Sequence, residues 1–384
     1  IMLFGGIAVL LTGQITPINA LKSINLDVLL FLFGMFVVGQ ALEESGYLSH
    51  LSYKFFNRAK SVDHLILFIL FGLGAASAFL MNDTLAIIGT PVVLLLAKKH
   101  NISAKLSLLA LAFAITIGSV MSPIGNPQNL LIAINGNITN PFITFSKFLL
   151  IPTLINLFLA YLLLKLFYKK QFHNKALTHS LEPLKDRKLA AISKSSLILI
   201  IVLVIAKIIT VLLNMQIDFR LTYIALISAL PILLLSPKRF DRIRKIDWHT
   251  LIFFAAMFIL MESVWESGFF QSVINALNLN ISSVIMILAI SVILRQLISN
   301  VPLVALYLPM LMHVGTSTKG MMALAAGSTI AGNLFILGAA SNVIIIQNAE
   351  KKWGETLTFL EFAKIGIPMT VINVFVYWLF LGMV

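Results

Sequence analysis

The sequence contains no cysteine, and only 11% of its 384 residues are charged. The lack of cysteine excludes disulfide bonds, thiolate metal sites and cysteine nucleophiles. Acidic residues are fewer than basic ones, 15 against 28, and the 7 histidines form no metal-binding spacing. The scarcity of charge also excludes an ordinary soluble domain, because 59% of the residues are hydrophobic and the mean hydropathy is +0.98. Such a composition predicts an all-α protein with many membrane spans.

The common sequence motifs of enzymes are missing as well. No Walker A pattern occurs, so the chain itself is not expected to hydrolyse ATP. Neither HExxH nor GxSxG is present, and no second aspartate is placed in the sequence to partner Asp83. No catalytic constellation can be assembled, so no cofactor is expected and an intramembrane enzyme is only a distant alternative.

Long apolar runs predict about nine transmembrane crossings. They cover residues 2–20, 26–43, 106–134, 146–168, 195–213, 221–236, 249–267, 321–348 and 363–384. Two further apolar segments, 64–97 and 283–313, are each interrupted near the middle by polar residues. Each arm of these two segments, roughly 12–18 residues, reaches part or just the whole of a hydrocarbon core of about 30 Å. Both segments are therefore predicted to be re-entrant hairpins.

The distribution of basic residues supports the hairpins and orients the chain. If both hairpins return to the side they came from, nearly all loop Lys and Arg residues lie on one side of the membrane. The other side then holds only Lys22, Lys147, Arg220 and Lys319. The positive-inside rule assigns the basic side to the cytoplasm. We therefore expect a multi-pass protein of the cytoplasmic (inner) membrane, in contact with lipid and not nucleic acid, with its N-terminus inside and its C-terminus outside.

A repeat divides the chain into two halves. The repeated segments are Met35-Phe36 and Met257-Phe258, then Glu44-Ser45-Gly46 and Glu266-Ser267-Gly268, then Asn82 and Asn300, Pro91 and Pro309, Gly125 and Gly338, and Asn129 and Asn342. An odd number of crossings between the starts of the two copies inverts the second copy. Inverted repeats with polar breaks at matching places are typical of secondary transporters.

The repeat predicts the organisation of the chain. Residues 1–24 form a leading transmembrane helix, and residues 25–168 form the first repeat with the cytoplasmic-side hairpin 64–97. A polar, charged segment, 169–194, is the cytoplasmic linker. Connecting transmembrane helices occupy 195–245, and the second repeat occupies 246–384 with the outer-side hairpin 283–313.

The two hairpin tips and two breaks in the helices that follow them are predicted to meet. Backbone released from helical pairing in hydrocarbon must line protein or a wet cavity, and helix N-termini there can face an anion. The candidate substrate- and ion-binding residues are Asn82, Asp83, Thr84, Gly125, Asn126, Pro127, Asn129, Ser299, Asn300, Ser341, Asn342 and Arg295. A sodium ion, if one couples transport, is expected near Asn82, Asp83, Gly125 and Asn300.

Two charged residues near the tips have more than one interpretation. Asp83 either carries a proton or binds a cation, because a carboxylate in a membrane is costly, or it caps the second hairpin arm. Arg295 aligns with Ser77 of the first repeat. It binds an anionic substrate, pairs with Asp83, or extends to the outer interface.

The repeated pattern resembles the ion transporter superfamily of ArsB-type arsenical pump membrane proteins, NhaD-type antiporters and divalent anion–sodium symporters. In the dicarboxylate branch each tip carries Ser-Asn-Thr, whereas here the tips read Met81-Asn82-Asp83 and Ser299-Asn300-Val301. Both asparagines match, but both threonine positions and the first serine do not. The Asn-Asp tip and the turn Pro123-Ile124-Gly125-Asn126-Pro127 are closest to the arsenical-pump-like anion permease branch. The resemblance implies a homodimer.

The sequence thus predicts an ion-coupled secondary active transporter of a small anion or oxyanion, of the arsenite or carboxylate kind. It is expected to work by alternating access with H+ as the coupling ion, and Na+ is the alternative. A sodium/proton antiporter and a sodium-coupled dicarboxylate symporter are the competing functions. A channel is disfavoured, because paired inverted hairpins suit alternating access better than a continuous pore.

Overall fold

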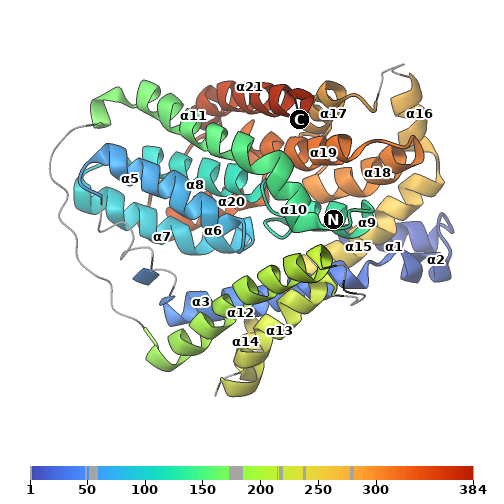
Figure 1. Cartoon of the computed structure of the whole chain (residues 1–384), viewed down its shortest axis with the longest axis horizontal. Helices are drawn as coiled ribbons and strands as arrows, with labels where there is room; N and C mark the ends of the chain where they lie inside the picture. The colour runs from blue at the N-terminus through green and yellow to red at the C-terminus, as the bar shows by residue number, and fades with distance from the viewer. Residues whose placement is uncertain are drawn as a thin grey trace.

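The computed structural model describes residues 2–47, 50–51, 59–172, 185–213, 215, 219–236, 239–276 and 281–383. Every regular element in these residues is a helix, as predicted (Figure 1). Five of the helices are long and apolar enough to cross a membrane. They are Leu26–Ser45, Pro141–Phe167, Arg187–Leu212, Trp248–Glu266 and Phe359–Met383.

One group of helices, which we call the scaffold, lies mostly along the lower edge of the molecule in Figure 1, and α15 leads from there to α16 at the upper right. Helix α3 packs against α12 and α13, and α15 packs against α1 and α2. The backbone of α13 at Ala225 lies so close to Gly34 of α3 that no side chain fits there. The scaffold consists of α1 (Met2–Leu11), α2 (Pro17–Ser23), α3 (Leu26–Ser45), α12 (Arg187–Leu212), α13 (Leu221–Leu235), α14 (Arg239–Lys245), α15 (Trp248–Glu266) and α16 (Phe269–Ala276).

The remaining helices form a second group, which we call the core. Its first half comprises α5 (Val62–Phe68), α6 (Gly74–Ser77), α7 (Asn82–His100), α8 (Ala104–Ser119), α9 (Pro127–Asn135), α10 (Pro141–Phe145) and α11 (Ile151–Phe167). Its second half comprises α17 (Val284–Leu294), α18 (Asn300–His313), α19 (Thr318–Ile330), α20 (Ala340–Trp353) and α21 (Phe359–Met383). Short π-helical segments, Ile69–Leu73 and Ser146–Leu150, join α5 to α6 and α10 to α11.

Both segments that the sequence predicts as hairpins fold back on themselves. In the first, Asp63 at the start of α5 pairs with Lys165 at the end of α11. Just after α7, the backbone N–H of Ser103 donates to Gln171, which also follows α11. The two ends of this hairpin therefore lie on the same side. In the second, the hydroxyl of Tyr307 in α18 donates to the carbonyl of Ile281, just before α17.

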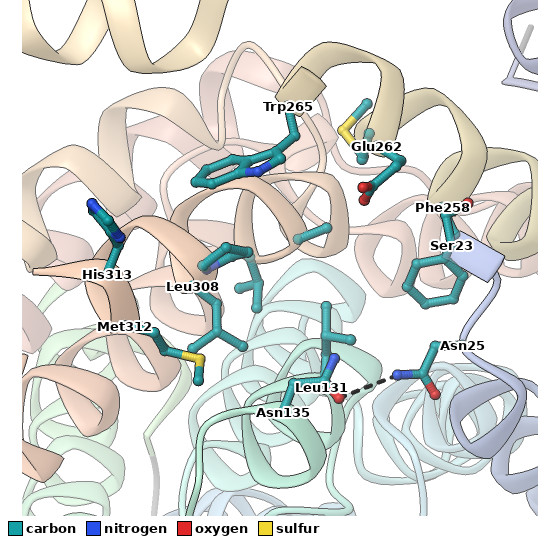
Figure 2. A pocket seen from close by; sticks show the side chains of 14 residues that line it. Ser23, Asn25, Leu131, Asn135, Phe258, Glu262, Trp265, Leu308, Met312 and His313 are labelled. Carbon is teal, nitrogen blue, oxygen red and sulfur yellow. Dashed lines mark hydrogen bonds between the residues drawn. The ribbon is translucent and has the colours of Figure 1, made fainter. Parts of the chain in front are cut away.

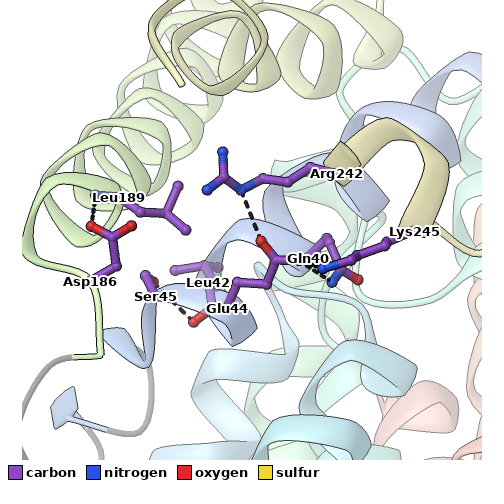
Figure 3. A network of polar contacts seen from close by, with 8 residues as sticks. All are labelled: Gln40, Leu42, Glu44, Ser45, Asp186, Leu189, Arg242 and Lys245. Carbon is purple, nitrogen blue, oxygen red and sulfur yellow. Dashed lines mark hydrogen bonds and ion pairs between the residues drawn. The ribbon is translucent and has the colours of Figure 1, made fainter. Parts of the chain in front are cut away.

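Loops that the sequence assigns to the cytoplasm gather at one end of the molecule. There, Glu44 at the end of α3 pairs with Arg242 and Lys245 of α14 (Figure 3). The backbone N–H of Lys185 donates to the carbonyl of Ser45. At the other end Asn19 contacts Glu266, Asn25 contacts Asn135, and Thr222 contacts Asp27.

The two halves use the same local devices. Both hairpins begin their second arm at the repeated asparagine, Asn82 or Asn300, and carry a proline, Pro91 or Pro309, at the matching position inside it. The repeated Glu-Ser-Gly turn ends α3 at Gly46, whose φ of 68° is a left-handed conformation that favours glycine. Its copy, Gly268, has a φ of 69°.

Two predicted boundaries are wrong. The leading segment 1–24 is not one helix, because α1 ends at Leu11 and Gly13 turns with a φ of 72° before α2 starts at Pro17. The predicted linker 169–194 is too long at its C-terminal end. The side chain of Asp186 accepts the first free N–H groups of α12, so that helix already begins at Arg187. Residues 173–184 of that linker lie outside the described residues.

The crossing of α6 and α8 leaves no space for a side chain at Gly118. A Cβ atom there would lie 2.2 Å from the backbone oxygen of Gly74. We expect Gly118→Val to destabilise the fold by about 1–3 kcal/mol or more, because backbone cannot yield as a side chain can. Gly382→Val is the matched control, since nothing lies within 4 Å of its Cβ position. Thermal unfolding in detergent checks this, and equal midpoints for the two variants would contradict the described crossing.

Candidate functional site

A cavity of about 470 Å³ lies where both hairpin tips meet the N-terminal end of α15. We call it the tip cavity. It is lined by Asn82, Asp83, Pro127, Asp247, His249, Thr250, Phe253, Phe254, Arg295, Ser299, Asn300, Val301, Ala339 and Ala340. Core and scaffold both contribute to its wall, so movement of one against the other would reshape it.

Four helices begin at this cavity. Helices α7, α9, α18 and α20 begin at Asn82, Pro127, Asn300 and Ala340, and each of these four residues lines it. The first N–H groups of a helix lack intrahelical partners and carry partial positive charge. Their convergence therefore makes the cavity favourable for an anion.

Arg295 adds a full positive charge to the same wall. It is only 4% exposed, so it does not extend to the outer interface. One of its terminal nitrogens donates to the carbonyl of Thr329 at 2.5 Å, and the guanidinium lies against Gly332, where a Cβ would be 2.9 Å from it. Its Nε has no hydrogen-bond partner among the described residues. A buried, incompletely paired arginine is costly unless a ligand completes its pairing.

Asp83 also faces the tip cavity, half-buried. Its backbone N–H, rather than its carboxylate, bonds to the side chain of Asn82 at 3.0 Å. No ion pair joins Asp83 to Arg295 within the part of the chain that the structure describes, so the predicted alternative of a direct pair is not seen. The carboxylate thus faces the cavity wall without a cationic partner in contact.

The expectation that no second aspartate accompanies Asp83 is wrong. Asp247, which precedes α15, lines the tip cavity and a smaller neighbouring cavity of about 120 Å³, both together with Asp83. Its side chain, however, caps α15, with one oxygen accepting the N–H of Thr250 and the other its hydroxyl. Both oxygens are engaged, so Asp247 has a structural role beside Asp83.

A polar network at the first break holds the two halves together. The Asn300 side chain donates to Gln128 at 2.7 Å, and Gln128 donates to the hydroxyl of Thr329 at 3.2 Å. Asn126 donates to the same hydroxyl, which in turn donates to Asn129. Thr329 thus joins the first break to the helix that precedes the second one.

The repeated asparagines close their own breaks. The side chain of Asn129 donates to the carbonyls of Ser119, Val120 and Ser122. In the second half Asn342 donates to Gly332, which occupies the position of Ser119. Gly125 accepts the N–H of Asn82 and so joins the first break to the first tip. These groups satisfy backbone that the breaks release, as buried polar groups require.

The predicted site residues therefore fall into two sets. Asn82, Asp83, Pro127, Arg295, Ser299 and Asn300 line the tip cavity, and Thr84 lines the small neighbouring cavity. Gly125, Asn126, Asn129, Ser341 and Asn342 lie behind the wall, fully or almost fully buried. The predicted sodium ligands are likewise divided, because Gly125 does not line the cavity.

The sequence did not identify several residues that the structure brings to the site. Asp247, His249 and Thr250 were missed because they belong to the end of an ordinary span, far from any break. Thr329 lies inside an apolar run and carries no sequence signal. Gln128 stands within the first break, and its position between Pro127 and Asn129 could have revealed it.

Comparison with known proteins now bears on the family. The sequence profile of the citrate transporter family, CitMHS, matches residues 1–320. The chain belongs to this family. The silicon efflux transporter LSI3 of Oryza sativa subsp. japonica is 26% identical, over 96% of this chain and 89% of that protein. An uncharacterised transporter of Mycobacterium bovis is 26% identical, over 97% and 90%.

One further relative of this CitMHS protein matches over only part of its own length, and one solved structure has a similar fold. The P protein of Homo sapiens is 25% identical over 92% of this chain but only 53% of its own length. The crystal structure of the YdaH transporter of Alcanivorax borkumensis is similar with a TM-score of 0.62, covering 95% of this chain and 87% of that one at 16% identity. This likeness concerns the fold. The protein is a membrane transporter of the CitMHS family, consistent with a non-enzymatic role.

The network at Thr329 can be tested with a control from the other repeat. Thr329→Val removes a hydroxyl with three side-chain partners, and leaves amide donors of Asn126 and Gln128 unpaired. We expect Thr329→Val to lower the free energy of unfolding by roughly 1–3 kcal/mol and to weaken substrate transport. Thr116, the equivalent residue of the first repeat, is buried with a hydroxyl that lacks a partner among the described residues. Thr116→Val should leave the free energy of unfolding nearly unchanged. Equal thermal unfolding midpoints for the two variants would contradict the network.

Proposed function

We propose that this CitMHS protein is an ion-coupled secondary active transporter of a small anion or oxyanion. The anion binds in the tip cavity against Arg295 and the four helix N-termini. The core then moves against the scaffold and exposes the cavity to the other face of the cytoplasmic membrane by alternating access. The observation that carries the proposal is the buried, incompletely paired Arg295 beside four helix starts.

The size and polarity of the tip cavity favour a compact substrate. A volume of about 470 Å³ with one buried guanidinium suits an oxyanion or small carboxylate. Asn82, Ser299 and Asn300 supply neutral donors and acceptors beside it. The family is named for citrate transport, and the relative LSI3 is named a silicon efflux transporter. Citrate, orthosilicate and arsenite therefore belong in a panel of test substrates.

We propose H+ as the coupling ion, with Asp83 as its carrier. The carboxylate faces the anion site without a cation in contact, so its charge would repel an anion unless it held a proton. Proton and anion would then occupy the cavity together. Sodium is the alternative coupling ion, held near Asn82, Asp83 and Asn300. We also propose that the protein acts as a homodimer, in line with the resemblance.

The first experiment uses purified protein in sodium-free proteoliposomes that carry a pH-sensitive dye. Arsenite, phosphate, orthosilicate and citrate are added in turn, with and without a pH gradient. A proton flux triggered by one of them supports proton coupling. Uptake that occurs only after sodium is restored would replace H+ by Na+, and no transport of any anion under either condition would contradict the proposed function.

Arg295 is predicted to determine anion affinity. Arg295→Gln removes the charge, and we expect the KM for the transported anion to rise at least about tenfold. Arg295→Lys keeps the positive charge but loses the planar guanidinium, which can donate two parallel hydrogen bonds to an anion. Its KM should therefore lie between those of the wild type and Arg295→Gln. Radiolabelled uptake measures both, with thermal unfolding as the check of folding. An unchanged KM in folded Arg295→Gln would exclude Arg295 from the site.

Asp83 is predicted to couple transport to protons. In Asp83→Asn we expect anion exchange between the two sides to continue while anion-driven proton flux disappears, because an amide cannot carry the proton. Asp241→Asn is the control, since Asp241 is an exposed acid on α14. Wild-type coupling in Asp83→Asn would show that Asp83 serves only as part of the first turn of α7.

A further inference from the structure

A second large cavity, of about 620 Å³, lies on the side of the molecule opposite the predicted cytoplasmic end (Figure 2). We call it the outer cavity. Helix α15 contributes Phe258, Met261, Glu262 and Trp265, and the wall opposite is made by α9 and α18. In Figure 2 the carboxylate of Glu262 points into the space between these helices. None of the proposed binding residues lines this cavity.

The outer cavity is the repeat counterpart of the small cavity beside Asp83. That small cavity is lined by Phe36, Gly39, Gln40 and Glu43 of α3. The spacing that pairs Met35 with Met257 pairs these four residues with Phe258, Met261, Glu262 and Trp265, which line the outer cavity. Asp247 of the small cavity corresponds in the same way to Asn25 of the outer one. The walls that α3 and α15 contribute therefore match at all four of these positions, and Asp247 matches Asn25, whereas Ile246 and Thr250 line only the small cavity and Ser23 only the outer one.

The core walls of the two cavities match only in part. In the small cavity α20 contributes Ala340 and Ile344, whose counterparts in α9 are Pro127 and Leu131. Leu131 lines the outer cavity and Pro127 does not, and the wall extends instead to Asn135, four residues farther along α9.

Helix α18 shows the same displacement. The residues Asp83, Thr84 and Ile87 of α7 have the counterparts Val301, Pro302 and Ala305. Of these counterparts only Ala305 lines the outer cavity, whose α18 wall extends from Val304 to His313. Both comparisons place the core about one helical turn, or ~6 Å, closer to the cytoplasmic end than the repeat symmetry requires.

Exchanging the conformations of the two repeats gives the opposite state. The core would move ~6 Å toward the outer side, and the tip of the second hairpin would then lie against α15 as the first now lies against α3. The first hairpin tip contacts α3 closely, because a Cβ atom on Gly39 would be 3.6 Å from the Cβ of Thr84. The second tip would have to form the same contact with α15. Its counterpart joins Met261 to Pro302, directly beside Glu262.

This movement changes the surroundings of Glu262. In the present state it is half-buried, faces a large cavity, and makes no hydrogen bond or ion pair within the described residues. In the opposite state the second hairpin tip would close on it at membrane depth, where a carboxylate charge is costly. Its counterpart Gln40, which already lies in the closed arrangement, is a neutral amide bonded to Glu44.

We propose that Glu262 is a proton-binding site on the scaffold, loaded from the outer side, whose protonation permits the core to reach the outward-facing position. The inference rests on the alternating access of the proposed function but not on the identity of the anion. The other charged or titratable groups near the outer-cavity end of these helices are Glu266, His313, Lys22 and Asp27. His249 of α15 lines the tip cavity instead, and Tyr307 of α18 donates its hydroxyl to the carbonyl of Ile281. Only His313 among them lines the cavity, and Glu266 contacts Asn19 beyond it.

The absence of native cysteine allows a direct test of the movement. Gly39→Cys with Thr84→Cys should form a disulfide in the present state, since the separation of 3.6 Å suits one. Met261→Cys with Pro302→Cys should form one only after the movement. Both pairs are oxidised in membranes with and without the panel anions. Formation of both disulfides supports the displacement, whereas failure of the Met261–Pro302 pair under every condition would overturn it.

The role of Glu262 is tested by the yield of the Met261–Pro302 disulfide in acidic and neutral external media. Acid should raise this yield about five- to tenfold relative to the Gly39–Thr84 pair. Adding Glu262→Gln should hold the yield high at both pH values, because glutamine mimics the protonated acid. Glu266→Gln is the control and should keep the pH dependence. Persistent pH dependence with Glu262→Gln would overturn the proton site.

These outcomes are separable from those of the proposed function. If both disulfides form with the expected pH dependence but no anion is transported, the anion assignment fails and the role of Glu262 stands. If anions are transported and the Met261–Pro302 pair never forms, the proposed function stands and the inference fails.

Discussion

The structure depends on how backbone is satisfied at the centre of a membrane. Two hairpins and two broken helices end there, and each helix end releases polar groups that hydrocarbon cannot satisfy. The protein meets this demand with its own amides: Asn129 and Asn342 close the breaks, and Gly125 accepts from the first tip. The helix starts at Asn82, Pro127, Asn300 and Ala340 line the tip cavity. The breaks that the fold requires therefore also gather these helix starts at the proposed anion site.

The chemistry of the site arises where the two repeats differ. Arg295 replaces a serine of the first repeat, and Asp83 corresponds to a valine of the second. The hydroxyl of Thr329 has side-chain partners, whereas that of Thr116 has none among the described residues. In the proposed mechanism, the repeat symmetry accounts for two equivalent positions of the core against the scaffold. The charged substitutions would give these two positions different electrostatics, as the proposed coupling to an ion gradient requires.

The architecture was accessible from the sequence because its signals are local and repeated. Asn82 and Asn300 begin helices as expected, and the basic loops gather at one end of the molecule. The failures come from interactions that apolar patterning does not encode. Asp186 extends α12 by capping it, and Gly13 and Pro17 divide the leading segment. Asp247 and Thr329 reach the site through packing between the halves, which no spacing within either half reveals.

The proposed mechanism requires that one site between the hairpin tips is exposed to each face in turn. Ser299→Cys, in the otherwise cysteine-free chain, places a single thiol in the tip cavity. Its reaction with a membrane-impermeant maleimide would be measured in right-side-out and inside-out vesicles, with and without each anion of the panel. The account predicts reaction from both faces, slowed on both by the anion that is transported. Reaction from only one face under all conditions, or reaction that a transported anion leaves unchanged, would contradict it.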